Sequence, residues 1–213
     1  MMIPPSPGRG VRAVPALAAL AAAALAAGCA GTETGAEWVD PQFAGIPLRG
    51  SRIMVVCSAA DLPARKLCQD VLAAELTARG ASPVIGPDSA ADGPRPLAEA
   101  ALGAARTAGA RAIFSAAIAA EGTVARPGPS IGVGVGGYGG GRVGIGGGIG
   151  ISLPIGGGRV DQALGATGVL TNVATGRTMW TVRASAPAGR DASAQVSALG
   201  KAVVEAAQKA GFF

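Results

Sequence analysis

Side chains that could carry out acid–base or metal chemistry are sparse in this sequence. Its 213 residues include no histidine, so a Ser-His-Asp or Cys-His catalytic arrangement is excluded and a zinc site is disfavoured. The acidic residues are isolated from one another, which leaves no pair of carboxylates for glycoside hydrolysis. We therefore predict that the protein is not an enzyme and that it has no catalytic, metal-binding or cofactor-binding residues.

One glycine pattern matches a dinucleotide-binding fingerprint by its letters alone. Gly132, Gly134 and Gly137 have the spacing G-x-G-x-x-G. That fingerprint must join a strand to the start of a helix, whereas here more glycines follow, alternating with valine and isoleucine. The pattern therefore predicts no nucleotide cofactor.

Two of the three cysteines fall in segments that we expect to pack against each other. Cys57 lies late in an apolar, β-branched run at residues 52–58, which indicates a buried strand, and Cys68 lies one to two turns into the helical pattern that follows. An even pair of thiols in an oxidising compartment favours a disulfide. Free cysteine is also a common small core residue, so the sequence leaves both alternatives open.

The third cysteine, Cys29, ends a segment with the composition of a secretory leader. Two arginines precede an apolar run at residues 14–27, and small residues follow it. Residues 25–29, Leu-Ala-Ala-Gly-Cys, resemble the bacterial lipobox. The resemblance implies that residues 1–28 are a signal peptide and that Cys29 carries acyl chains such as palmitate, two or three of which anchor a protein stably. Because Ala30 rather than Asp follows, resemblance to enterobacterial sorting favours the outer membrane, with the domain facing the periplasm.

The remaining chain is expected to form one domain behind a tether. We assign residues 29–50 to a lipidated tether and N-terminal segment, with the small, polar residues 30–36 flexible, and residues 51–213 to a single α/β domain. Strands and helices alternate as β-α-β-α-β, and then come an antiparallel pair of strands and a last helix. The predicted strands are residues 52–58, 82–85, 111–118, 162–173 and 178–183, and the predicted helices are residues 63–79, 97–108 and 193–209. This order predicts an α/β sandwich of two or three layers around a mixed sheet.

A glycine-rich insert occupies residues 131–158. Fifteen of its 28 positions are glycine, and apolar residues alternate with them on both sides of a central Gly-Gly-Tyr-Gly-Gly-Gly-Arg. Period two around a turn predicts a hairpin, weakened by the backbone entropy of glycine. The first arm is short and Pro154 interrupts the second, so we expect a periplasmic hairpin or loop rather than a membrane-spanning one.

Short motifs outside the insert form a set. They are Trp38-x-Asp40-Pro41, Arg65-x-x-x-Gln69-Asp70, Gly109-Ala110-Arg111-Ala112 and the hairpin sequence from Asn172 through Thr175-Gly176 to Trp180. Together they resemble a family of uncharacterised proteobacterial outer-membrane lipoproteins, which is distantly similar to the curli-secretion and penicillin-binding-protein-activator lipoproteins. The resemblance implies an α/β sandwich at the periplasmic face of the outer membrane, and it transfers no catalytic residues.

These features favour a non-enzymatic, lipid-anchored envelope protein that binds another protein or itself. Trp38, Trp180 and Tyr138 are candidate contact residues, although Trp180 also suits a core position. One alternative is a self-assembling structural or pore-like, secretion-type lipoprotein that uses the glycine-rich hairpin, and a weaker one is an activator of cell-wall synthesis. Basic residues are scattered without stacking aromatics, which argues against nucleic acid, and no small-molecule substrate suggests itself.

Replacing Cys29 tests the anchor. Cys29→Ala should abolish incorporation of a labelled fatty acid and leave the protein uncleaved or soluble, because the acylated thiol is lost. Labelling in cells followed by fractionation measures this. A variant that keeps Cys29 but lacks the other two cysteines should still be labelled. Membrane-bound, labelled Cys29→Ala protein would contradict the lipobox assignment.

Overall fold

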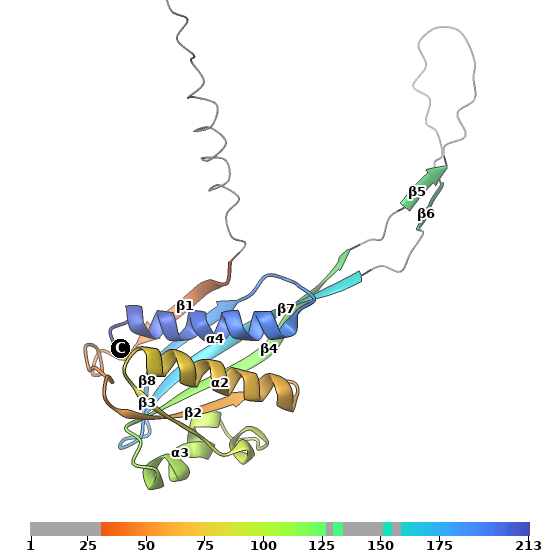
Figure 1. Ribbon diagram of the computed structural model, residues 1–213. Coiled ribbons are helices and arrows are strands. Elements are labelled where there is room, and N and C mark those ends of the chain that lie inside the picture. The colour runs from red at the N-terminus through yellow and green to blue at the C-terminus, as the bar shows by residue number, and fades with distance from the viewer. Residues whose placement is uncertain (1–30, 127–129, 134–150, 155–158) are drawn as a thin grey trace, which may run out of the picture. The chain divides into compact units, whose positions relative to one another are not determined.

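The computed structural model describes residues 31–126, 130–133, 151–154 and 159–213 (Figure 1). Cys29, Tyr138 and most of the glycine-rich insert therefore lie outside the described residues. The folded unit extends from Thr32 to Phe213. No helix in the described part is long and apolar enough to cross a membrane.

A six-stranded mixed sheet forms the centre of the unit, in the order β1-β8-β7-β4-β2-β3. Parallel pairing joins β2 to β3 and to β4, and antiparallel pairing joins the other neighbours. The strands are β1 (Glu33–Val39), β2 (Arg52–Ser58), β3 (Ser82–Ile85), β4 (Ala112–Arg126), β7 (Arg159–Asn172) and β8 (Thr178–Ser185). Two short strands in the insert, β5 (Ser130–Val133) and β6 (Ile151–Pro154), pair antiparallel as a separate sheet, as the alternation predicts.

Helices lie on both faces of the sheet. Helix α2 (Leu62–Ala78) connects β2 to β3, while the 3-10 helix η1 (Asp88–Ala91) and helix α3 (Leu97–Thr107) connect β3 to β4. The connection through α2 runs from β2 to β3 at the sheet edge, and the connection through α3 runs in the opposite direction across the sheet, from β3 to β4 on the other side of β2. Because both crossovers are right-handed, α2 and α3 lie on opposite faces of the sheet. Helix α4 (Ala192–Lys209) lies beside α2 (Figure 1). The predicted α/β sandwich with a mixed sheet and a C-terminal helix is confirmed.

The main core lies between the sheet and the pair α2 and α4. Its centre is an aromatic cluster in which the Trp180 ring lies 6.1 Å from that of Phe114 and 6.4 Å from that of Phe212. All three side chains are fully buried. The rest is mostly alanine, valine, leucine and isoleucine, so these aromatic rings supply much of the buried area per residue.

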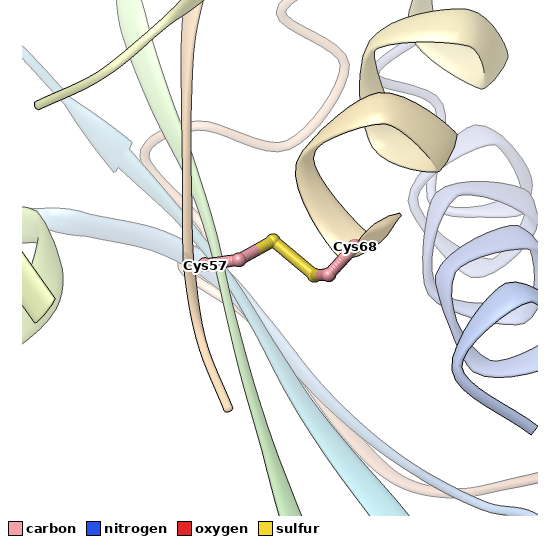
Figure 2. Close-up of a disulfide and its surroundings, with 2 residues drawn as sticks. All are labelled: Cys57 and Cys68. Carbon is pink, nitrogen blue, oxygen red and sulfur yellow. A yellow bond between two sulfur atoms is a disulfide. The ribbon is translucent and has the colours of Figure 1, made fainter. Parts of the chain in front are cut away.

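A disulfide ties α2 to the sheet. Figure 2 shows Cys57 on β2 reaching Cys68 on α2. The Cα atoms are 6.2 Å apart, within the range that a disulfide spans without backbone movement. Both residues are almost completely buried.

Local signals place α2 as expected. The Asp61 carboxylate accepts a hydrogen bond of 2.7 Å from the backbone N–H of Ala64, which caps the helix, and Pro63 lies in the first turn. The helix ends before Gly80, whose φ of 83° belongs to the left-handed region that glycine adopts most readily.

The N-terminal segment differs from our expectation. Residues 30–36 were expected to be a flexible tether, but β1 starts at Glu33 and pairs with β8. The side chains of β1 are almost all exposed, so the strand carries no alternation of apolar residues by which the sequence could reveal it. Backbone hydrogen bonds to β8 hold it instead. The third predicted strand, residues 111–118, similarly continues to Arg126.

Small residues let the core layers approach closely. A Cβ added to Gly168 on β7 would lie 2.1 Å from Cγ1 of Val203 on α4. A Cβ on Gly200 of α4 would lie 2.8 Å from Cγ1 of Val71 on α2. The positions of α4 over the sheet and against α2 therefore both depend on the absence of a side chain.

We expect Gly168→Ala to destabilise the fold by about 1–3 kcal/mol, the usual cost of overpacking a core. Chemical denaturation measures the change. Gly103→Ala is the matched control, because the exposed Gly103 lies inside α3 with open space around its Cβ position. That control should stabilise by about 0.5–1 kcal/mol. Equal effects of the two changes would contradict the close α4–sheet contact.

Replacing both Cys57 and Cys68 by alanine should lower the free energy of unfolding by roughly 2–3 kcal/mol, because the bridge restricts the unfolded chain. The wild-type protein from the periplasm, denatured without reductant, should show no reactive thiol at these positions. Two reactive thiols per chain, or unchanged stability of the double variant, would contradict a structural bridge.

Candidate interaction surface

The face of the sheet opposite α2 and α4 is covered only in part. Helix α3 and η1 pack over β2 and the start of β4, where Met54, Val56 and Ile113 form a second, smaller core. Past this cluster, among the described residues, no helix covers the same face of β7, β8 and β1 (Figure 1). We call this area the bare face. It consists of Ala117 and Ala119 of β4, Gly165, Thr167 and Val169 of β7, Thr178, Thr181, Arg183 and Ser185 of β8, and Trp38 of β1. Ser115 and Thr171 continue the same rows and are buried at the border with the η1–α3 segment.

Strand register assigns these residues to one side. Ser115 pairs with Val169, and Ala117 pairs with Thr167, which in turn pairs with Arg183. Directly opposed residues in antiparallel strands point to the same face. Their chain neighbours, such as Leu170, point into the main core. Alternate residues of β7 thus point to opposite faces, with mostly small and hydroxyl-bearing residues on the bare face and mostly apolar residues in the main core.

A charged pair closes one end of the bare face. Glu121, at the end of its β4 row, accepts a hydrogen bond of 2.7 Å from the Ser185 hydroxyl and lies 3.5 Å from Nε of Arg183. Gly165 makes room for it, because a Cβ there would lie 2.2 Å from the Glu121 carboxyl carbon. A hollow of about 470 Å³ lies over this end.

The two tryptophans differ sharply in position. Trp38 pairs with Thr181 at the β1 edge of the bare face and is 49% exposed. Trp180 is fully buried, and its indole N–H donates to the Glu37 carboxylate at 2.6 Å. Trp180 is therefore a core residue rather than a contact for a partner, whereas Trp38 remains available.

A second hollow, of about 490 Å³, lies between the bare face and the η1–α3 segment. Its sheet side is formed by Ser58, Ser115, Ala117, Thr167, Val169, Thr171 and Thr178, and its other side by Ala90, Ala91, Gly93, Arg95, Pro96, Leu97 and Ala98. Hydroxyl groups therefore face a wall that is mostly apolar, with one guanidinium.

Ion pairs from α2 fix the η1 segment beside this hollow. Arg65 contacts the Asp92 carboxylate at 2.9 Å, and Lys66 contacts Asp88 at 2.7 Å. The hydrogen bond from Lys66 holds the pKa of Asp88 below its ordinary value. Both acids of the segment are thus neutralised by partners on α2.

The hairpin motif of the sequence has a structural role. The Asn172 side chain accepts hydrogen bonds from the backbone N–H and the hydroxyl of Thr175, which shapes the turn between β7 and β8. From this turn, Arg177 reaches the buried carboxylate of Asp40 at 2.8 Å. The ion pair between Arg177 and Asp40 therefore links the turn that contains Thr175-Gly176 to the Trp38-x-Asp40 motif, and it fixes the N-terminal segment to the sheet.

Sequence reasoning identified Trp38 but missed Arg95, Glu121, Thr171 and Arg183. Of these, only Thr171 had a signal, the alternation of hydroxyl-bearing with apolar residues in β7, and this alternation does not reveal which face of the sheet a helix leaves uncovered. In the described part of the chain, no three His, Cys, Asp or Glu side chains are grouped to hold a metal ion.

Comparison with known proteins yields no matching family model and no matching curated protein. Solved structures with a similar arrangement include the PelC dodecamer from Paraburkholderia phytofirmans, at 18% identity and TM-score 0.47, covering 81% of this chain and 94% of that one. Lipoprotein GNA1162 from Neisseria meningitidis is 15% identical at TM-score 0.39, covering 75% of this chain and 99% of that one. Likeness at this level does not establish a shared function, so the function must be argued from this chain's own residues.

Proposed function

We propose that this protein is a non-enzymatic, lipid-anchored envelope protein that binds another protein through the bare face. The observation that carries this proposal is the position of Trp38, an exposed indole at the edge of an uncovered sheet face. Tryptophan is enriched among the residues that dominate binding energy at protein interfaces.

The composition of the bare face supports docking of a protein surface. Ala117, Gly165 and Thr167 present small side chains, which permit close approach of a partner and lose little conformational entropy on binding. The Glu121–Arg183 pair at one end gives a polar rim, which matches the usual anatomy of an interface with an apolar anchor and a polar border.

The lipobox at Cys29 supports the envelope location. A lipid on Cys29 would hold the domain close to a membrane, because β1 begins only four residues after that cysteine. We propose the outer membrane and a periplasm-facing domain, as the Ala30 position favours. A protein held there would meet its partner at the membrane surface, which suits an adaptor.

A second candidate function, self-assembly, has an observation of its own. Beyond the main sheet, β4 and β7 continue as a two-stranded ladder from Gly122↔Ala163 to Arg126↔Arg159, whereas their neighbours β2 and β8 have ended. Val124 and Val160 on this ladder are 50% and 65% exposed. Gln162 in this ladder pairs with Gly189, but the strands continue past that bridge. Strand edges with exposed valines favour pairing with another copy. Nothing comparable favours activation of cell-wall synthesis.

Site-specific crosslinking in the native envelope tests the proposal. A photoreactive residue at Thr167, on the bare face, should give one discrete adduct, whereas the same residue at the exposed Lys201 on α4 should not. Adding Trp38→Ala should greatly reduce the Thr167 adduct, because the anchor is removed. Leu62→Ala, which removes an equally exposed apolar side chain on α2, should leave it unchanged.

The mass of the adduct separates the candidates. An adduct carrying a different protein supports the adaptor function, and one at twice the mass of this chain supports self-assembly. An adduct from Lys201 as strong as that from Thr167, or one insensitive to Trp38→Ala, would contradict docking on the bare face.

A further inference from the structure

The hollow between the bare face and the η1–α3 segment has an unusual distribution of donors. Its lining contains the start of α3, one arginine and several hydroxyls, and no acidic side chain. The proposed protein docking uses Ala117 and Thr167 of this lining, but it assigns no role to Arg95, to the start of α3 or to Thr171.

The N-terminus of α3 opens into the hollow without a cap. Its N-cap residue is Pro96, which makes no side-chain capping bond, and Leu97 and Ala98 of the first turn line the hollow. Helices α2 and α4 instead begin at Asp61 and Asp191, whose carboxylates accept backbone N–H groups. The free N–H groups at a helix start carry partial positive charge and bind anions.

Arg95 adds a full positive charge at the same place. Its guanidinium has no ion pair or hydrogen bond within the described residues, although it directly precedes Pro96 and lines the hollow. The acids nearest along the chain before it, Asp88 and Asp92, are committed to Lys66 and Arg65. Glu99, in the first turn of α3, does not line the hollow and only partly offsets the helix charge.

Thr171 provides an independent indication of a ligand. It is only 5% exposed, it lines the hollow from the sheet side, and its hydroxyl has no hydrogen-bond partner within the described part of the chain. The buried side-chain atoms without a partner in the described residues are Arg65 Nε and Gln69 Oε1, so the Thr171 oxygen itself is open to the hollow. It can therefore donate to a bound acceptor there at no cost to a contact within the protein.

We propose that this hollow binds the carboxylate of a small, mostly aliphatic group. One guanidinium and one helix start match a single negative charge, and Thr171 supplies a third donor from the opposite side. Leu97, Val169 and Ala90 would contact the apolar body of the ligand. The carboxylate can belong to a free acid or to the C-terminus of a chain, since both present the same group.

Titration of the mature, full-length protein in detergent tests the site by following backbone amide resonances. N-acetylvaline should shift the amides of Leu97 and Ala98 with saturable, millimolar binding, while its uncharged amide, N-acetylvalinamide, should not. A tripeptide ending in valine with a free carboxylate should bind more tightly if the natural ligand is a chain terminus, and equally if it is a free acid. Both outcomes support the site.

Variants separate binding from folding. Arg95→Gln should weaken N-acetylvaline binding about tenfold, in line with loss of one charge-assisted hydrogen bond. Thr171→Val should weaken it severalfold without lowering the melting temperature, because the hydroxyl stabilises nothing within the protein. Arg106→Gln, at the other end of α3, is the matched control and should bind normally.

Three results would overturn the proposal: no saturable shift at Leu97 and Ala98, equal shifts with N-acetylvalinamide, or unchanged binding by Arg95→Gln. The proposal does not depend on the protein-binding function. Titration with a small acid requires no partner, and crosslinking at Thr167 with its Trp38 dependence requires no acid, so either can fail alone.

Discussion

The handedness of two strand connections determines which surface of this protein is free. In the strand order, β3 lies at the sheet edge on one side of β2, and β4 lies on the other side of β2. Right-handed crossovers therefore put α2 and α3 on opposite faces of the sheet. The C-terminal helix α4 then joins α2, so two helices cover one face and a single short one covers part of the other. The bare face, the hollow beside α3 and the exposure of Trp38 all result from this unequal division.

The same division explains the chemistry of the two sides. On the covered side, a core poor in aromatic residues gains area from the Trp180 cluster and gains contact from glycines that let α4 approach. On the open side, hydroxyl-bearing and small residues suit a sheet face that contacts solvent. Because side chains alternate along β7, this one strand supplies apolar residues to the core and hydroxyl-bearing residues to the open face.

The sequence predicted elements with strong internal patterns and missed those held by their neighbours. Residues 52–58 and the helices had clear periodicity or caps such as Asp61, and the structure contains them. Strand β1 has exposed side chains, so its existence depends on backbone pairing with β8, which no local pattern encodes. For the same reason Trp38 and Trp180 could not be separated, because burial depends on which face of which strand the indole occupies.

The candidate site was still less accessible to sequence reasoning. Arg95 and Thr171 lie 76 positions apart, and neither belongs to a motif. They share the hollow for two reasons. The register of β4 and β7 puts Thr171 opposite Ile113, and α3 packs over Ile113 on the same face of the sheet. Register and crossover must both be known before the two residues can be placed together.

Charge is arranged unevenly along the bare face, and this arrangement allows two kinds of contact. At one end, Glu121 neutralises Arg183 and accepts a hydrogen bond from Ser185, so that end presents a satisfied polar rim to a partner. At the other, Arg95 has no ion pair among the described residues, and the start of α3 has only Glu99 in its first turn to offset its charge. Burying the paired charges of Glu121 and Arg183 under a docked protein would cost little free energy. Burying the unpaired guanidinium of Arg95 without an anion would cost much more. A protein covering the whole face would therefore have to bring a carboxylate to the α3 end, or leave that end open to a separate ligand.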